Sequence, residues 1–211
     1  MDDLLIHKHR VILIGGTSHT GKSTLAQSLA HKLGWSWLST DSLARHPGRP
    51  WRIKPEVVPE HVAEHYLSLS VDELLADVLR HYRENVWPIA SALVIAHATD
   101  PSIDGLVLEG SALWPDWVAA LDLDNIAAIW LTASNLFIAQ RIHLESHYHQ
   151  KTRHERLMID QFLNRTLVFN KQMMVAVRQL GLLYLDVTAA PSLEQLSGES
   201  LALLTSTDKC K

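Results

Sequence analysis

The stretch GGTSHTGKST (residues 15–24) constrains this chain more than any other part of its sequence, and it follows directly on the apolar run RVILI. From Gly16 to Ser23 it fits the pattern G-x-x-x-x-G-K-[ST], which is typical of phosphate-binding loops. Glycines let the backbone adopt positive φ angles, so successive N–H groups can turn inward around an anionic oxygen. The pattern predicts a nucleotide site formed by Gly16, Thr17, Ser18, His19, Thr20, Gly21, Lys22, Ser23 and Thr24.

Two side chains of this loop have expected roles. Lys22 is expected to reach the β- and γ-phosphates of ATP, and the Ser23 hydroxyl is expected to coordinate Mg²⁺. The sequence therefore predicts ATP and Mg²⁺ as cofactors.

The residues around the loop favour this interpretation over an accidental glycine-rich turn. The β-branched run 11–14 is typical of a buried parallel strand. Leu25, Leu29 and Leu33 recur four apart on one helical face, and Gly34 stands where a glycine ends a helix. Strand, loop and helix thus follow in the order that aims a helix N-terminus at an anion.

The whole chain alternates between strand-like and helical segments. The expected strands are residues 10–16, 35–40, 105–110, 125–132 and 182–188. Because helical patterns lie between these runs, we expect an α/β fold of the P-loop NTPase type, a mostly parallel sheet with helices on both faces. No repeat or linker divides the chain, so a single domain over residues 1–211 is expected.

Two capping boxes mark the long helices. Ser70 with Glu73 is expected to begin one, which Pro88 should kink near its middle. Thr152 with Glu155 is expected to begin another that runs to about Gly181.

Shorter helices are expected on either side of that second long helix. One covers residues 135–146, and a last one begins after a Ser192 cap. The polar stretch 146–151 would be a hinge, so residues 141–156 are predicted to form a mobile lid.

Composition narrows the class of protein. The 211 residues carry a formal net charge of −4, which argues against a general nucleic-acid binder. A single cysteine, Cys210, cannot form an internal disulfide, and no apolar run approaches the length of a membrane span. We therefore expect a cytoplasmic protein that needs neither membrane nor nucleic acid. Seven tryptophans could supply a homodimer interface or simply core.

Asp41 follows the second expected strand, where the carboxyl ends of parallel strands face a ligand crevice. It is a candidate to accept the proton of a substrate hydroxyl as that hydroxyl attacks the γ-phosphate. The alternative is that Asp41 only caps the next helix.

The predicted substrate loop, residues 41–60, is rich in cations and prolines. Its cations are Arg45, Arg49, Arg52 and Lys54. Arginines grip oxyanions in a fork, so this loop is predicted to bind a substrate that carries phosphate or carboxylate. A solvated basic loop is the alternative.

Glu109 ends the strand-like run GLVLE and is the second expected acid of the site. An acid at such a strand end helps to hold Mg²⁺ or its water, which would also place Glu109 near the substrate. A cap or a lysine partner is the alternative.

The lid segment carries Arg141, Arg153 and Arg156. Arginines brought in by a closing lid would stabilise the charge that phosphoryl transfer spreads over the equatorial oxygens. Individually each could be a surface ion pair, for instance Arg156 with Asp160.

Two further motifs are rejected. HVAEH (61–65) matches an inverted zinc-protease pattern, but among 13 histidines such a match is easily accidental and no third ligand is evident. NKQM (170–173) lacks the aspartate of a guanine-reading motif and is expected to lie inside a helix.

The motifs GGTSHTGKSTLA, STDSL and VLEGSALWP, followed by the lid arginines and LDVT, together resemble small P-loop kinases. The chain looks most like 2-phosphoglycerate kinase and the gluconate, shikimate and chloramphenicol kinase group. The resemblance implies a five-stranded parallel sheet, ATP and Mg²⁺, and phosphorylation of a small hydroxylated metabolite. By position it also implies Lys22 and Ser23 as phosphate and metal residues, Asp41 and Glu109 as site acids, and Arg141, Arg153 or Arg156 as the lid arginine.

The sequence thus favours an ATP-dependent phosphotransferase acting on a hydroxyl of a small metabolite. Two alternatives stay open. A nucleoside monophosphate kinase would use the basic loop to grip the acceptor's phosphate, with Trp51 stacking on its base. A nucleotide-dependent switch or binding module would need no acceptor at all.

Overall fold

A five-stranded parallel sheet forms the centre of the computed structural model, which describes residues 8–44, 48–52, 57–189 and 192–206. Its strand order is β2-β3-β1-β4-β5. The strands are β1 (Val11–Gly16), β2 (Ser36–Ser39), β3 (Leu106–Glu109), β4 (Ile126–Thr132) and β5 (Tyr184–Asp186). Every pairing is parallel. The predicted fold class is confirmed, and each strand lies within a run expected from the sequence.

The central strand β1 is buried along its whole length, because helices cover both faces of the sheet. Its side chains alternate between two cores. Ile12 and Ile14 face one of them, and Val11 and Leu13 face the other.

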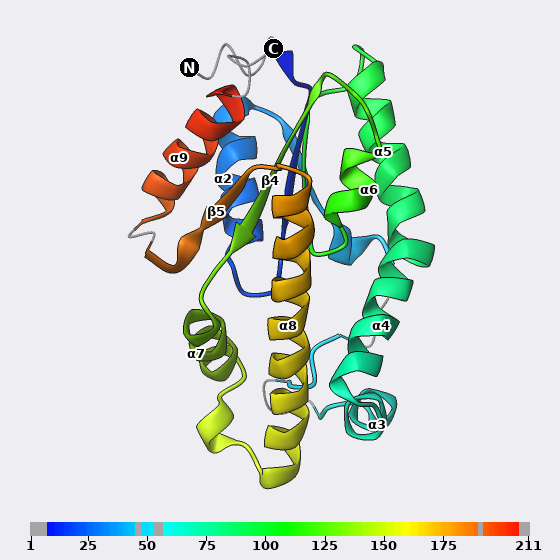
Figure 1. Cartoon of the computed structure of the whole chain (residues 1–211), viewed down its shortest axis with the longest axis vertical. Helices are drawn as coiled ribbons and strands as arrows, with labels where there is room; N and C mark the ends of the chain where they lie inside the picture. Colours follow the sequence, from blue (N-terminus) through cyan, green and yellow to red (C-terminus); the bar gives the residue numbers. More distant parts are fainter. Residues whose placement is uncertain (1–7, 45–47, 53–56, 190–191, 207–211) are drawn as a thin grey trace.

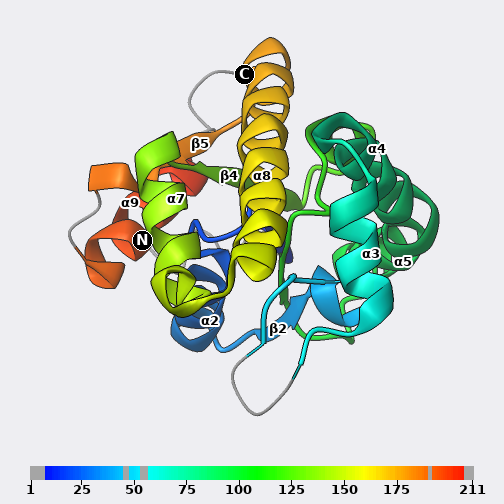
Figure 2. The same cartoon turned by 90° about the horizontal axis from the view of Figure 1, so that it is seen from below.

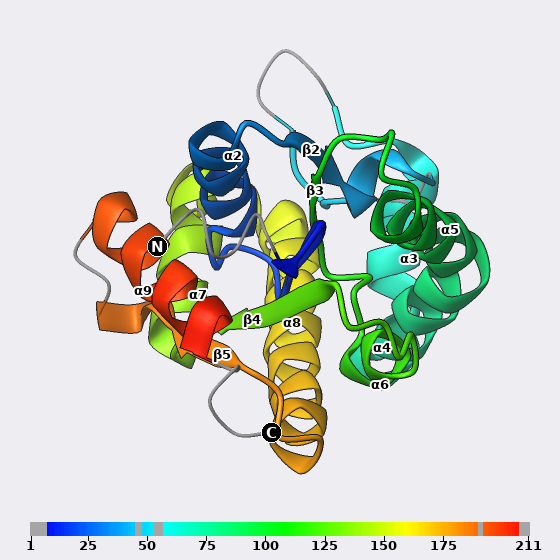
Figure 3. The same ribbon diagram turned by 90° about the horizontal axis from the view of Figure 1, so that it is seen from above.

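One face of the sheet is covered by α2 (Lys22–Leu33) and α9 (Leu193–Ser206), as Figures 1 and 3 show. Leu25, Leu29 and Leu33 of α2 are buried there, as their four-residue spacing predicts. Gly34 ends α2 in the left-handed conformation, and its N–H donates to the Ala30 carbonyl. The helix after the phosphate loop therefore begins and ends as expected.

The other face packs against α4 (Val71–His81), α5 (Trp87–Thr99), α6 (Pro115–Ala119) and the carboxyl half of α8 (Arg153–Gln179). The amino half of α8 extends past the sheet toward α7 (Asn135–Glu145) and α3 (Glu60–Ser68) (Figure 1). Seen from below, α7, α8 and α3 surround the end of the molecule where the strands of the sheet terminate (Figure 2).

Both capping boxes predicted from the sequence are present, and the long helix expected through Pro88 is interrupted by a π-helical turn. Ser70 with Glu73 caps α4, and Thr152 with Glu155 caps α8. Between α4 and α5 the chain makes a π-helical turn, η2 (Tyr82–Val86), where the Trp87 N–H donates to the Tyr82 carbonyl. Pro88 lacks the N–H that a regular α-helix would use at this point, so the wider turn accommodates it.

Two local features differ from the sequence expectation. The last strand stops at Asp186, because its carboxylate accepts from the N–H and hydroxyl of Thr188 and turns the chain into η4 (Val187–Ala189). The helix α3 was not expected, and it begins at the end of the predicted substrate loop. Within the described residues, no helix is long and apolar enough to cross a membrane.

Candidate active site

The loop between β1 and α2 is held in a compact turn by hydrogen bonds from its side chains to its own backbone. The Thr17 carbonyl accepts from Lys22 Nζ at 2.7 Å and from Thr20 Oγ1 at 2.9 Å. Gly21 precedes α2 with φ +86°, a left-handed conformation that glycine adopts without strain. The N-terminus of α2 and its unpaired N–H groups therefore point where an anion can bind.

This loop opens onto a cavity of about 990 Å³ at the carboxyl ends of the strands. The cavity is lined by Ser18, His19, Gly21, Lys22, Ser23 and Thr24 of the loop, by Asp41, Arg49, Tyr82, Glu109 and Ser111, by Arg141 and Glu145 of α7, and by Phe162 and Arg165 of α8. In a parallel α/β sheet this edge is the usual place for a ligand. The phosphate loop and both predicted acids thus meet in one cavity.

Ser23 and Glu109 form the most direct link between two predicted site residues. Ser23 Oγ donates to Glu109 Oε1 at 2.9 Å, and Glu109 is 3% exposed. Burial lowers the pKa of nearby Lys22, while Glu109 and Asp41 act to raise it. Hydroxyl and carboxylate oxygens are the donors that Mg²⁺ prefers, so this pair fits that ion.

A cation bound here would complete its coordination with water and phosphate oxygens. In the part of the chain that the structure describes, no three His, Cys, Asp or Glu side chains come together as a metal site. Mg²⁺ commonly keeps waters and substrate oxygens in this way.

Asp41 lies in the short turn η1 (Thr40–Ser42) that follows β2. The cap of this turn is Ser39, whose Oγ accepts from the Asp41 N–H at 3.3 Å. The Asp41 side chain is therefore not needed as a cap, and it lines the cavity.

The basic segment after Asp41 is only partly described, since Arg45 and Lys54 lie outside the described residues. Arg49 lines the cavity and pairs with Glu145. Arg52 Nη1 donates to the carbonyls of Arg49 and Trp51 at 2.7 and 2.8 Å, which holds residues 48–52 in a compact bend.

The three lid arginines lie in different surroundings. Arg141 lines the cavity with its guanidinium over the Phe137 ring and beside Gly21 of the loop. Arg156 donates to the carbonyls of Tyr148 and His149, so it braces the short turn η3 (Tyr148–Gln150). Arg153 begins α8 and does not appear among the cavity-lining residues. Arg141 is the one whose position suits contact with phosphate.

Arg165 is a site residue that sequence reasoning missed. It is 7% exposed, lines the cavity, and donates to Tyr66 Oη at 3.3 Å. Its guanidinium also lies 4.7 Å from the Phe162 ring centroid. The available signal was a charge between Phe162 and Phe169 on the apolar face of a long helix.

Tyr82, which also lines the cavity, was missed because it belongs to the π-helical turn. Burial raises the pKa of its hydroxyl, so the group stays protonated at neutral pH. Nothing in the sequence distinguishes it from a core tyrosine.

His19 has an unusual backbone and a confined side chain. Its φ of +67° is left-handed, a conformation that costs a non-glycine residue on the order of 1 kcal/mol. The side chain is 4% exposed, and Nε2 lies 2.9 Å from Glu145 Oε2, although the ring is not turned for a straight hydrogen bond. Burial, then Arg49, Lys22 and Arg141, lower the pKa of His19 to about 3.

The two rejected motifs lie away from the cavity. His61 and His65 belong to α3, where His65 Nε2 is 3.9 Å from Asp77 Oδ2. Asn170 lies inside α8, and its amide joins Thr132 and the Ala133 carbonyl. It thus fastens α8 to the end of β4.

The sheet order and the helices that cover it match the fold of solved gluconokinase and shikimate kinase structures. The chain is similar to a gluconokinase from Sinorhizobium meliloti 1021, with TM-score 0.53 and 21% identity over 92% of this chain and 90% of that one. It is also similar to a shikimate kinase from Aquifex aeolicus vf5, with TM-score 0.51 and 13% identity over 93% and 97%. A sugar kinase from Janibacter sp. HTCC2649 gives TM-score 0.50 and 18% identity over 92% and 93%.

These identities are low, so the likeness concerns the fold. No family model matches the chain, and no curated protein sequence matches it. The activity therefore has to be argued from the residues of the cavity.

Proposed function

We propose that this protein is an ATP-dependent phosphotransferase that moves the γ-phosphate to a hydroxyl of a small metabolite. The observation that carries the proposal is that one cavity of about 990 Å³ contains the phosphate loop, the Ser23–Glu109 pair and Asp41. The similarity of the fold to gluconokinase and shikimate kinase supports the same conclusion.

The chain's own groups suit the phosphate end of this reaction. Loop N–H groups and Lys22 would bind the β- and γ-phosphates, and Arg141 lies beside Gly21 to neutralise charge on the transferred group. Ser23 and Glu109 would hold Mg²⁺, which supplies positive charge to the phosphate oxygens when bound.

Asp41 would act at the acceptor end. Its carboxylate takes the proton of the acceptor hydroxyl while the new oxygen–phosphorus bond forms and the bond to the β,γ-bridging oxygen breaks. ADP leaves with the bridging oxygen, and the product is a phosphate monoester.

The acceptor is expected to carry a carboxylate or phosphate. Arg165 is a buried guanidinium that forms no ion pair with a carboxylate among the described residues. A buried charge without a counter-ion is costly, and an anionic ligand would supply one. Arg49 at the cavity wall adds a second cation on this side.

The alternative of a nucleoside monophosphate kinase has less support. Trp51 is 6% exposed and packs edge-on against Phe162 with centroids 4.9 Å apart, so its ring faces are not open for a base. A switch or binding module would not need Asp41 and Arg165 in the cavity. The single domain over residues 1–211, a cytoplasmic location and a homodimer stay predictions.

The proposal is tested by thermal shift and ADP release. Purified protein is measured with Mg²⁺-ATP alone and with sugar acids, phosphoglycerates, aminoglycosides and nucleoside monophosphates. We expect stabilisation by Mg²⁺-ATP and ADP release that rises with an anionic hydroxylated acceptor. Asp41→Asn should lower that turnover by roughly 10²–10⁴-fold with nucleotide binding retained. The absence of any ATP effect would contradict the proposal, and turnover that ignores every acceptor would favour the switch.

A further inference from the structure

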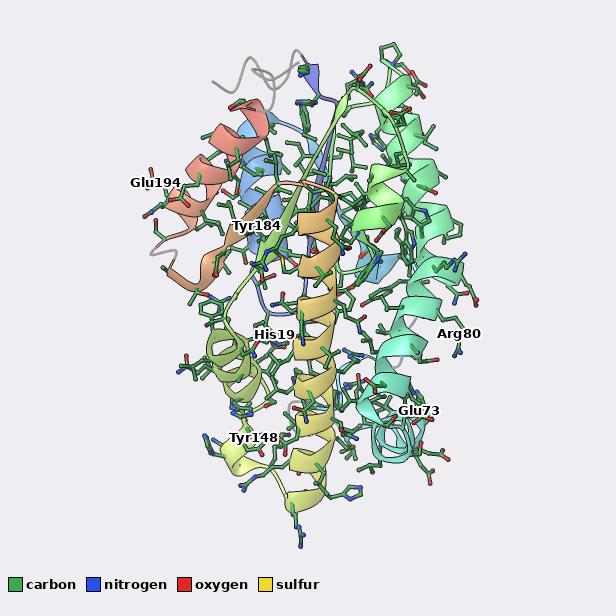
Figure 4. The ribbon with its side chains drawn as sticks, viewed as in Figure 1. His19, Glu73, Arg80, Tyr148, Tyr184 and Glu194 are labelled. Atoms are coloured by element: carbon green, nitrogen blue, oxygen red, sulfur yellow. The ribbon has the colours of Figure 1, made fainter. Side chains whose placement is uncertain are left out.

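The His19 side chain connects the phosphate loop to three parts of the molecule that are far apart in sequence. Its backbone belongs to the phosphate loop, while its side chain approaches Glu145 at the end of α7. Its ring also lies 6.0 Å from the ring of Trp51 and 6.0 Å, edge-on, from that of Phe162 in α8. Figure 4 shows His19 between α7 and α8.

Glu145 is shared between this histidine and the basic segment. One carboxylate oxygen lies 2.9 Å from His19 Nε2, and the other pairs with Arg49 Nη1. A second contact joins the same two regions, because Lys151 Nζ donates to the Arg52 carbonyl at 3.1 Å. Segment 48–52 and hinge 146–151 are thus tied to each other, and Glu145 ties both to the phosphate loop.

The backbone of His19 indicates that its side chain is needed. A left-handed residue that is not glycine persists only where its surroundings hold it, and such residues cluster at functional sites. Here the surroundings are the Glu145 carboxylate and the rings of Trp51 and Phe162. A glycine would give the loop the same backbone without strain, but it would lose all three contacts.

We propose that His19 is a positioning residue that couples the phosphate loop, through Glu145, to segment 48–52 and hinge 146–151. The proposal rests on the proposed kinase function. Phosphate binding in the loop thereby changes the position of the segments on the acceptor side of the cavity. Closure of those segments over the acceptor in turn changes the position of the phosphate loop.

Because burial and neighbouring cations lower the pKa of His19 to about 3, the side chain is neutral at physiological pH. The 2.9 Å approach of Nε2 to the Glu145 carboxylate is thus a contact of a neutral ring with a carboxylate and not an ion pair. The link therefore does not depend on a proton taken up near pH 7.

The test is amide hydrogen–deuterium exchange on the whole chain, with Mg²⁺-ADP as the probe. In the free protein, His19→Gly and Glu145→Gln are each expected to speed exchange in segments 48–52 and 146–151 about tenfold, because each removes contacts that hold these segments to the phosphate loop. Exchange in β1 and α9 should not change. Glu194→Gln on the exposed side of α9 is the matched control and should alter neither segment.

Mg²⁺-ADP gives the second readout. In the wild-type protein it is expected to protect the phosphate loop and both distant segments, whereas in His19→Gly it should protect the loop alone. His19→Gln, which keeps a polar side chain of similar reach toward Glu145, should restore the distant protection. With an acceptor found by the panel above, His19→Gly should lower kcat by roughly 10-fold to 100-fold while the KM for ATP changes little.

Unchanged exchange of both segments in His19→Gly would overturn the proposal, as would distant protection by Mg²⁺-ADP that persists in that variant. Failure of the kinase function would look different. Mg²⁺-ADP would then leave the wild-type phosphate loop unprotected, and exchange in the free proteins would still decide whether His19 couples the segments.

Discussion

Lys22 and Arg165 are both buried cations, but their surroundings differ. Lys22 has the Thr17 carbonyl at 2.7 Å and is influenced by the charges of Glu109 and Asp41. Arg165 has a tyrosine hydroxyl and two aromatic rings. Lys22 is therefore compensated within the protein, whereas for Arg165 we propose that an anionic ligand supplies the counter-charge.

Arg165→Met is expected to separate activity from stability. The methionine keeps much of the apolar stem and removes a desolvated charge, so the melting temperature should stay equal or rise. Response to an anionic acceptor should fall by at least roughly 10²-fold, because a bond to a charged partner is lost. Thermal unfolding and acceptor titrations measure the two effects. A large loss of stability would mean that Arg165 serves the core instead, and exposed Arg83→Met is the control.

Glu109→Gln tests the proposed metal role. Glutamine keeps an oxygen for the Ser23 hydroxyl but loses the negative charge. The Mg²⁺ concentration needed for half-maximal ATP turnover should rise by roughly 10-fold to 100-fold, while nucleotide binding without metal changes little. A titration of turnover against Mg²⁺ measures this, and an unshifted curve would remove Glu109 from the metal site.

For single residues, the sequence predicts a place in the site where that place follows from a local pattern. The phosphate loop, Asp41 and Glu109 each adjoin a strand end, and all of them line the cavity. Arg165 and Tyr82 could not be found in this way, because helices bring them to the cavity from distant parts of the chain. The roles assigned to all of these residues stay predictions until they are tested.

The elements were predictable where their signals are local. Capping boxes and alternating apolar runs use neighbouring residues, so α4, α8 and the strands were anticipated. The π-helical turn before Pro88 was not anticipated, because the width of a helical turn depends on the side chains that pack around it. Helix α3 was not predicted, because the prolines and cations that precede it are typical of a loop.

Two glycine-to-alanine substitutions, one in a strand and one in a helix, are expected to change the free energy of unfolding in opposite directions. A Cβ on Gly15 in β1 would lie 2.2 Å from Nε1 of Trp130, whose ring is fully buried and donates to the Leu113 carbonyl. Gly15→Ala should therefore destabilise the protein by about 3 kcal/mol or more. On the exposed side of α9, nothing lies within 4 Å of a Cβ on Gly198, so Gly198→Ala should stabilise by about 0.5–1 kcal/mol.

Urea unfolding of the two glycine variants measures both changes. If Gly15→Ala were tolerated, Trp130 could move, and the close packing of β1 against β4 would not be rigid. If Gly198→Ala failed to stabilise, α9 would not be a regular helix at that position.

At the scale of the whole molecule, buried histidines should make the fold sensitive to acid. The pKa of His19 is about 3 in the folded protein against 6.5 in an open chain, and burial also lowers the pKa values of His9 and His65. Between pH 6.5 and pH 3 the unfolded chain thus binds more protons than the folded one. The free energy of unfolding must then fall as the pH drops through this window.

His19 alone is expected to account for up to about 4 kcal/mol of that loss. His19→Gln should shrink the difference between the unfolding free energies measured at pH 7 and pH 4.5, whatever its effect at pH 7. Denaturant titrations at the two pH values measure it. An identical difference in both proteins would mean that His19 stays solvated or protonated in the folded state.

The strand order belongs to the whole molecule and was the least accessible to sequence reasoning. Alternating strands and helices predicted a parallel sheet, and the resemblance implied five strands. The order β2-β3-β1-β4-β5 depends on which crossovers pass over which face, and that is settled by packing between distant segments.

Helix α8 is held near its middle by two side-chain hydrogen bonds, and its amino half extends past the sheet, where it packs against α7 and α3. Thr17 Oγ1 donates to the Thr166 carbonyl beside the phosphate loop, and Thr132 donates to Asn170 one turn further on. Thr152 then lies roughly 21 Å along the axis from Thr166, at 1.5 Å per residue. A rigid-body tilt of α8 about these contacts, together with the helices packed on its amino half, would act as a lever with its fulcrum beside the phosphate loop. A tilt of about 5° there would carry the hinge roughly 2 Å, so small adjustments around phosphate would be magnified at the rim of the cavity.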